Sequence, residues 1–533
     1  MRELIEEFVA DRDCLRRLHP ISFAPDGIRR LVTLHEDWLA RIAGLDFDGL
    51  DSAAQTDYVL FDRHLRSEIS QLDRVREKSM DWAEWAPFAD VILDLEARRV
   101  RHEPVDAPWS AAVIEGVSES VDELVKRLAD EDSIAPPIAF RAHAVVKELS
   151  EAVDRWFTFF GLYDPLVRWW TETPVAHLKE SMSAYLELLK KRSDDKPGQV
   201  SVAPPVGRAP LEADLAADLI PYSPEELIAI ADREFAWCRQ EMMRAAEELG
   251  FGDDWRAAQE HVKTMHVAPG GQPAVVRDLA LEAIEFLEEH DLLTIPDLAK
   301  ETWRMRMMTP AEQKINPFFL GGETIYVSYP TADMTHAEKL MSMRGNNRFF
   351  SRATVQHELI PGHHMQFFML ARHRPYRELF GTPFWIEGWA LYWEMLLWDL
   401  GFPSSPEERI GMLFWRTHRC VRIVFSLKFH LGEMSADECV DMLVNEVGHE
   451  RATAEGEIRR SFQGSYPPLY QLAYMIGGLQ FRAMAAEIVP AMGLKPFHDA
   501  ILRENEMPVT VLRSVLKKER FAKEGPAAWR FDG

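Results

Sequence analysis

Two histidines and two glutamates in the second half of the chain have the types and the order of a catalytic zinc site. Residues 357–364 read H-E-L-I-P-G-H-H, and Glu387 follows in the stretch I-E-G-W-A-L-Y-W-E. Imidazole nitrogens and carboxylate oxygens are common zinc ligands, and a glutamate beside a ligand histidine serves as the general base of zinc hydrolases. The spacing departs from the H-E-x-x-H pattern by two inserted residues.

An unbroken helix cannot bring these histidines together. Imidazoles at positions i and i+4 lie about 40° apart around a helix and roughly 6 Å apart along it, so both reach one ion. His363, six residues after His357, would point about 240° around the helix. His364 would face correctly, but it would lie about 10 Å away, which is too far for bonds of about 2.1 Å.

A proline–glycine step between the histidines offers a remedy. Pro361 lacks the N–H that would bond the carbonyl of His357, and its ring clashes with that carbonyl. Gly362 adds a permissive backbone. Inside a helix the two residue types cost about 3 and about 1 kcal/mol, so their position between two candidate ligands favours a function. We predict one wide turn that brings His363 beside His357.

The third ligand is expected from a separate helix, where Glu387 is the candidate. Glu394 lies seven residues further on and therefore on the same helical face. It either orients a ligand histidine or is a solvated or structural acid. Glu358 is the predicted general base, and a set of two histidines and one glutamate leaves a fourth position for water. The competing interpretation is a pair of core histidines on a packed helix.

The motifs H-E-L-I-P-G-H-H-M-Q, E-G-W-A-L-Y-W-E and the later Y-M-I-G that begins at Tyr474 resemble an uncharacterised bacterial family with the signature H-E-x-x-P-G-H-H-x-Q. That family looks like a remote branch of the zinc peptidases. It is similar in layout to angiotensin-converting enzyme, the neurolysin-type oligopeptidases and the helical metallocarboxypeptidases. The resemblance implies a mostly α-helical body split by a channel, with the zinc at its floor and a short strand beside it.

The resemblance also implies roles for single residues. When the Gly-His pair of those peptidases is aligned with Gly362 and His363, His363 becomes the ligand. His364 is then a neighbour and the alternate ligand. Tyr474 fits a phenol that stabilises an oxyanion, or else a packed helix tyrosine. The strand over 323–330 offers an edge to an extended peptide, or else forms a structural hairpin.

The residues before Tyr474 depart from the family pattern. Tyr470 stands where the family has a glutamine, and Arg459 and Arg460 are both candidates to bind a substrate carboxylate. His449 is a further candidate for the site, although a lone histidine is more often structural. Helix-spaced tryptophans either line a channel or belong to the core: Trp385, Trp389 and Trp393.

These residues together predict a zinc-dependent hydrolase with one Zn²⁺ per chain, acting as a peptidase on small or unstructured peptides. The first alternative is a zinc amidohydrolase that cleaves non-peptide amides or amino-acid conjugates. The second alternative, from another class, is a catalytically inactive relative that binds a ligand or a protein in the same cleft. The intact glutamate beside His357 favours catalysis over this last interpretation.

The composition agrees with such an enzyme and excludes other classes. The chain has 533 residues and a formal net charge of −25, which argues against nucleic acid or an anionic membrane surface as the partner. No apolar run approaches the ~20 residues that cross a bilayer, and the first residues resemble an amphipathic helix, so we expect cytoplasmic residence. Four scattered cysteines are expected to be buried free thiols: Cys14, Cys238, Cys420 and Cys439.

The elements that must position the site are predicted to be mainly helices. Apolar periodicity predicts an N-terminal helical region over 1–195 and a second over 212–533, with the catalytic core at about 300–525. The two regions are expected to pack as halves around one cleft, joined by a linker over 192–211. Ser223 is the predicted N-cap of a helix that runs toward Leu249. Alternation over 301–329 predicts one small antiparallel sheet.

Overall fold

The protein is mainly α-helical, which confirms the predicted fold class. The computed structural model describes residues 1–130, 134–193, 202–313, 321–462, 466–520 and 522–532. The chain divides into two compact units, of which the first comprises Met1–Asp46 and Phe61–Ala203, and the second Phe47–Leu60 and Pro204–Gly533. The predicted packing of two halves around one cleft stays a prediction. The predicted linker lies partly outside the described residues, and its last residues begin helix α8 (Arg208–Ala217).

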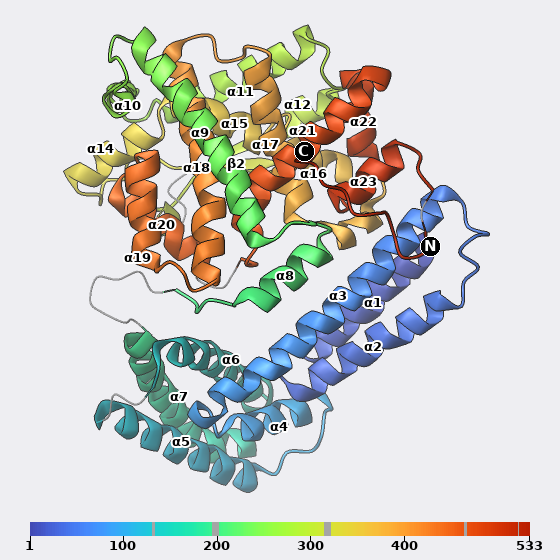
Figure 1. Ribbon diagram of the computed structural model, residues 1–533. Helices are drawn as coiled ribbons and strands as arrows, with labels where there is room; N and C mark the ends of the chain where they lie inside the picture. The colour runs from blue at the N-terminus through green and yellow to red at the C-terminus, as the bar shows by residue number, and fades with distance from the viewer. Residues whose placement is uncertain (131–133, 194–201, 314–320, 463–465, 521, 533) are drawn as a thin grey trace. The chain divides into compact units, whose positions relative to one another are not determined.

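The first unit is a helical body with its own apolar core (Figure 1). Helix α7 packs against both α5 and α6, and α4 packs on α6. The buried phenol of Tyr185 donates a hydrogen bond to the carbonyl of Trp85 over 2.7 Å, which satisfies its one polar group. The elements of this unit are α1 (Arg2–Leu18), α2 (Pro25–Ala43), α3 (Ser52–Trp82), η1 (Ala83–Trp85), α4 (Ala89–Val100), α5 (Ala107–Asp130), α6 (Pro136–Gly161) and α7 (Pro165–Ser193).

The segment Phe47–Leu60 groups with the second unit, although the sequence places it in the N-terminal region. Its Asp57 accepts hydrogen bonds from Arg377 Nε and from the Tyr376 hydroxyl, both over 2.8 Å. Arg377 and Asp57 are both buried. A buried guanidinium requires such a partner, and this pair explains why the start of α3 belongs with the second unit.

The second unit holds all the predicted site residues. Its helix α9 begins with the predicted N-cap Ser223, which forms a capping box with Glu226. Its elements after α8 are α9 (Pro224–Glu248), α10 (Trp255–Thr264), α11 (Gln272–Glu289), α12 (Asp297–Thr302), β1 (Arg304–Met307), α13 (Pro310–Gln313), β2 (Thr324–Val327), α14 (His336–Gly345), α15 (Arg348–Glu358), α16 (His363–Leu370), η2 (Pro375–Phe380), α17 (Pro383–Asp399), α18 (Pro406–His430), α19 (Ala436–Met442), η3 (Leu443–Val447), α20 (Arg451–Phe462), α21 (Tyr470–Met492), α22 (Leu494–Glu504) and α23 (Val509–Leu516).

Helices α15, α17, α18 and α21 form the interior of this unit. Helix α18 is buried along nearly its whole length and packs against α9, α15 and α21. Helices α17 and α21 approach closely at two glycines, because a Cβ on Gly388 would lie 2.6 Å from the Cα of Gly477. The three helix-spaced tryptophans of α17 are fully buried, so they belong to the core: Trp385, Trp389 and Trp393.

The small sheet contains the two predicted strands, but the prediction that they are antiparallel is wrong. Strands β1 and β2 pair in parallel, with Arg304 opposite Thr324 and Met307 opposite Val327. Two parallel strands need a crossover, and the chain between them is long enough to include α13. Ile325 and Val327 pack with Val355 of α15 and with α11, so the sheet lies beside the helix that carries His357.

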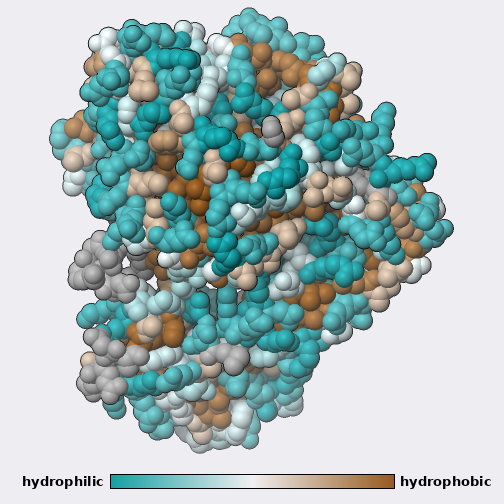
Figure 2. All heavy atoms as spheres, viewed as in Figure 1, coloured by the Kyte–Doolittle hydropathy of each residue, from teal (hydrophilic) through white to brown (hydrophobic). Residues whose placement is uncertain are grey.

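The surface is mostly polar on the face shown in Figure 2, where hydrophobic residues form separate patches. In the described ranges no helix combines the length and the apolar composition that a membrane span requires. The four cysteines are free thiols, as predicted, and Cys14 differs from the expectation by being exposed while the other three are buried.

Candidate metal centre

The helix that carries His357 stops one residue later and a new helix starts at His363. Asn347 is the N-cap of helix α15, and its side chain accepts bonds from two backbone N–H groups, while the helix ends at Glu358. Leu359 leaves the helical region with φ −108° and ψ −107°, and Gly362 caps α16. The peptide bond between Ile360 and Pro361 is cis. The structure therefore has a complete break where the sequence predicts one wide turn.

Gly362 is required at this break because there is no space for a side chain. A Cβ on Gly362 would lie 1.7 Å from the carbonyl oxygen of His357. Its N–H donates to the carbonyl of Gln356 over 3.1 Å, which holds the returning chain against the end of α15. As a result the rings of His357 and His363 lie 4.8 Å apart and are nearly perpendicular.

Helix α17 brings Glu387 to the break. The helix begins at Thr382, whose side chain accepts a bond from the N–H of Trp385, and it has Pro383 at its first position. The indole N–H of Trp389 donates to the carbonyl of Pro361 over 2.8 Å. This bond ties α17 to the break itself, so the third carboxylate is positioned by the same segment that positions the histidines.

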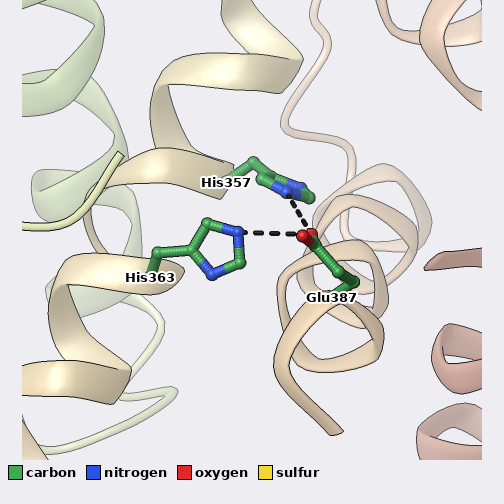
Figure 3. A group of neighbouring side chains, drawn as sticks. All are labelled: His357, His363 and Glu387. Atoms are coloured by element: carbon green, nitrogen blue, oxygen red, sulfur yellow. Dashed lines mark hydrogen bonds and ion pairs between the residues drawn. The ribbon is translucent and has the colours of Figure 1, made fainter. Parts of the chain in front are cut away.

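The three predicted ligands converge on one point (Figure 3). Oε2 of Glu387 lies 3.3 Å from Nε2 of His357 and 3.3 Å from Nε2 of His363. All three ligand atoms lie within 4.8 Å of one another, and all three residues are buried. Two ligands at zinc bond lengths near 2.0 Å in a tetrahedral site are about 3.3 Å apart, so the two separations between Glu387 and the histidines fit that ion.

The other nitrogen of each imidazole is held by an acceptor. Nδ1 of His357 lies 2.7 Å from Oε1 of Glu394, and Nδ1 of His363 lies 2.9 Å from Oε1 of Gln366. Gln366 is oriented in turn, since its amide N–H donates to the carbonyl of Ile386. With Nδ1 as the donor, each neutral imidazole presents an unprotonated Nε2 toward Glu387. Two nitrogen lone pairs and a carboxylate that face one another form a donor set suited to a cation.

The pKa shifts of His357, His363 and Glu387 also indicate a site that suits positive charge. Burial alone lowers the pKa of His357, but Glu387 and Glu394 outweigh it and raise the pKa to about 9. Burial also lowers the pKa of His363, and Glu387 more than compensates. Burial raises the pKa of Glu387, yet the two imidazoles bring it well below the usual range. The site thus favours positive charge between these three side chains.

Glu358 lies at the end of α15 and lines the cavity beside the cluster. Burial raises the pKa of Glu358 above the usual value for a carboxyl group. The chain before β2 passes directly over it, because a Cβ on Gly321 would lie 2.1 Å from Oε2 of Glu358. Gly322 N–H also donates to the Glu358 carbonyl over 3.3 Å.

Two tyrosines of α21 reach the cluster. The hydroxyl of Tyr470 donates to Oε1 of Glu387, the oxygen other than the one that lies near the two histidines. The ring of Tyr474 stacks on the ring of His357 at 5.9 Å and lines the cavity. Burial, with a contribution from Glu387, raises the pKa of Tyr474 to about 12, so its phenol keeps its proton at neutral pH.

Three other predicted candidates lie away from the metal cluster. Nε2 of His364 contacts the carbonyl of Ala299 at 2.8 Å, so the alternate ligand is engaged elsewhere. Nε2 of His449 lies 2.9 Å from Nδ1 of His418, and neither ring is among the residues that line the cavity. Arg459 is exposed, whereas Arg460 lines the cavity.

The cavity in front of the cluster has a volume of about 340 Å³. Its wall includes three residues for which the sequence analysis has no role: Trp415, Arg419 and Arg422. These three residues, together with Gln366 and Gly321, are functional candidates that could not be selected from the sequence. A signal was present for two of them, because Arg419 and Arg422 lie one helical turn apart in α18 with the apolar residues Cys420 and Val421 between them.

Fold and site together define a mainly α-helical protein with a buried histidine–histidine–glutamate cluster at the floor of a cavity. The chain belongs to the family described as "Bacterial protein of unknown function (DUF885)", whose family model matches residues 17–516. Among curated proteins none matches this chain.

Two solved structures are similar over their whole length. One, a "putative lipoprotein of unknown function" from Shewanella oneidensis, has a TM-score of 0.69 and 17% identity, with 96% of this chain and 99% of that chain covered. The other, a "putative lipoprotein" from Colwellia psychrerythraea, has a TM-score of 0.60 and 14% identity, with 97% and 98% covered. At these identities the likeness shows the fold alone, and the relation to zinc peptidases stays a prediction.

Proposed function

We propose that the protein is a zinc-dependent hydrolase that cleaves small or unstructured peptides. The observation that supports this most is the convergence of two Nε2 atoms on one carboxylate oxygen at 3.3 Å, with both Nδ1 atoms held by acceptors. His357, His363 and Glu387 would hold one zinc ion per chain. When bound, zinc supplies Lewis-acid activation of water and of the carbonyl to be cut.

The protein's own residues supply the remaining chemistry. Glu358 takes a proton from the attacking water as the C–O bond forms, and passes it to the leaving amine as the C–N bond breaks. The phenol of Tyr474 donates a hydrogen bond to the oxygen that becomes negative in the transition state. Tyr470 and Glu394 keep Glu387 and His357 in place through the hydrogen bonds described above.

The size of the cavity favours small substrates. A volume of about 340 Å³ is near the lower end of ligand pockets, which measure roughly 300–1,000 Å³. The same observation favours a second candidate, a zinc amidohydrolase that acts on N-acyl amino acids or similar amides. A comparison of turnover on dipeptides and on N-acyl amino acids separates the two.

A catalytically inactive binding protein is the alternative from another class. The metal content of protein purified without chelator tests it first, with about one zinc per chain expected for the enzyme. Partners other than a peptide or small amide are not expected, and neither nucleic acid nor a membrane suits the charge of −25. Cytoplasmic residence stays a prediction from the sequence.

The substitution Glu358→Gln tests the mechanism directly. Glutamine keeps the size of the side chain but cannot accept the proton, so we expect unchanged zinc content and a loss of turnover of about 10²–10⁴-fold. Glu433→Gln, at an exposed position, is the matched control and should retain full turnover. Turnover that survives in Glu358→Gln would remove this residue from the mechanism.

A further inference from the structure

Three arginines concentrate positive charge on one part of the cavity wall. Arg419 and Arg422 come from α18, and Arg460 comes from α20. The side chains of Arg419 and Arg422 are buried, with 5% and 3% of their surface exposed, and Arg460 is half-buried. Such a grouping beside the predicted reaction centre is costly, because each guanidinium repels the others in a low-dielectric environment.

The carboxylates near these arginines do not satisfy them. Arg422 donates from Nε to Glu457 over 2.7 Å, while its Nη1 is buried without a partner. Arg419 makes no hydrogen bond in the part of the chain that the structure describes, and its Nε is among the buried atoms without a partner. Its nearest carboxylate oxygen belongs to Glu394, at 3.9 Å, and the same oxygen already contacts His357.

Two other buried arginines of this unit each have a carboxylate at hydrogen-bond distance, as Arg422 does, although Nε and Nη1 of Arg416 are also buried without a partner. Arg416, one turn before Arg419 on the same helix, donates to Glu234 over 2.9 Å and does not line the cavity. Arg352 donates to Glu282 over 2.8 Å. Arg419 differs from them, because its carboxylate neighbour Glu394 lies beyond hydrogen-bond distance, and an anionic ligand in the cavity would supply the closer partner that a buried guanidinium requires.

The ring of Tyr474 connects these arginines with the metal cluster. The guanidinium carbons of Arg419 and Arg422 lie 4.5 and 4.6 Å from the centre of the ring, which also stacks on His357 at 5.9 Å. One aromatic ring therefore separates the cationic wall from the reaction centre. Since an extended chain advances about 3.5 Å per residue, an anion bound by these arginines lies one or two residues from the bond that is cut.

We infer that Arg419, Arg422 and Arg460 bind a free carboxylate of the substrate, one or two residues beyond the scissile amide. The inference rests on the proposed function for the reaction and adds the substrate class. Two kinds of substrate share this feature, peptides and N-acyl amino acids. In both, the amine side of the amide to be cut carries a free carboxylate. The protein would therefore cleave at the carboxyl end of peptides and spare internal bonds.

Binding of ligands that cannot be hydrolysed tests this inference without any turnover. The first probe is a dipeptide whose peptide carbonyl is reduced to methylene, prepared as the free acid and as the C-terminal amide. The second is an N-hexyl amino acid in the same two forms, which represents the N-acyl source. Calorimetry on the full-length protein as purified should show each free acid binding at least about tenfold more tightly than its amide, as charged hydrogen bonds require.

Variants locate the carboxylate site. Arg419→Gln and Arg460→Gln should each reduce the ratio of acid to amide affinity to within about threefold of unity, with affinity for the amide nearly unchanged. Arg416→Gln controls for the loss of a buried arginine on α18, and Arg459→Gln controls for an exposed one on α20. Both controls should keep the full ratio. If Arg419→Gln does not fold, as judged by circular dichroism, the half-buried Arg460→Gln carries the test alone.

The outcomes distinguish this inference from the proposed function. Equal affinity for acid and amide in the unmodified protein overturns it, and so does a ratio that persists in both arginine variants. A clear preference for the acids that depends on these arginines supports it even in a protein that hydrolyses nothing. If only the dipeptide probe binds more tightly as the free acid than as the amide, the substrate is a peptide. If the N-hexyl amino acid shows the same preference for the free acid, the substrate class includes N-acyl amino acids.

Discussion

Glu387 and Glu394 hold the two nitrogens of a single imidazole. Oε2 of Glu387 lies 3.3 Å from Nε2 of His357, and Oε1 of Glu394 lies 2.7 Å from Nδ1 of the same ring. Seven residues separate the two glutamates on α17, which places both on one helical face. The first carboxylate therefore faces the predicted metal position, while the second fixes which nitrogen of His357 is presented to it.

The first prediction concerns Glu394. Replacing it by glutamine weakens the acceptor that holds Nδ1 of His357, so zinc affinity should fall about 10- to 100-fold while the fold is retained. Competition with a chromophoric chelator measures this. Asp399→Asn, at an exposed position at the end of the same helix, should leave the affinity unchanged. An equal affinity in Glu394→Gln and the unmodified protein would contradict the orienting role.

The second prediction concerns Gly321, where a Cβ would lie 2.1 Å from Oε2 of Glu358. In Gly321→Ala either the strand segment or the carboxylate must move. Because catalysis depends on the placement of the general base, we expect kcat to fall at least about tenfold with unchanged zinc content. Gly116→Ala is the control, since a Cβ there meets no atom within 4 Å. Unaltered kcat in Gly321→Ala would mean that the position of Glu358 tolerates this crowding.

The third prediction links pH and stability through Glu506, which lies outside the site. Burial, with a contribution from Glu378, raises its pKa in the folded protein to about 8 from the ordinary value of 4.5. The folded state then holds a proton that the unfolded state has lost between these pH values. Stability from this group is present below about pH 4.5 and decreases as pH rises to about 8, by about 5 kcal/mol at most.

Glu506→Gln should remove this dependence. The variant should become more stable relative to the unmodified protein as pH rises from 5 to 8, as measured by urea unfolding at several pH values. Glu247→Gln, at an exposed position on α9, should leave the profile as it is. Parallel profiles for Glu506→Gln and the unmodified protein would show that the group titrates normally.

Local patterns were sufficient to predict the helical fold and to select the cluster. His357, Pro361, Gly362 and His363 lie in one short segment, and the requirement that two imidazoles reach one ion excludes a regular helix there. The detail differs, because the structure ends α15 at Glu358 and starts α16 at His363. A wide turn and a complete break satisfy the same spacing requirement, so the sequence could not separate them.

Features that depend on distant segments were not accessible in the same way. The relative direction of β1 and β2 depends on the path of the chain between them, and alternation along each strand carries no information on that path. Arg419 reaches the cavity only because α18 packs beside α15 and α21. Its sequence signal was an arginine repeated at one-turn spacing at Arg416, Arg419 and Arg422, and this repeat does not indicate which cavity the side chains face.

The most direct measurement is anomalous diffraction at the zinc absorption edge on crystals grown without chelator. The account predicts one peak per chain, about 2.0–2.2 Å from Nε2 of His357, Nε2 of His363 and one oxygen of Glu387. A map without a peak at this point, from protein supplied with zinc, would contradict the metal centre and the hydrolase built on it.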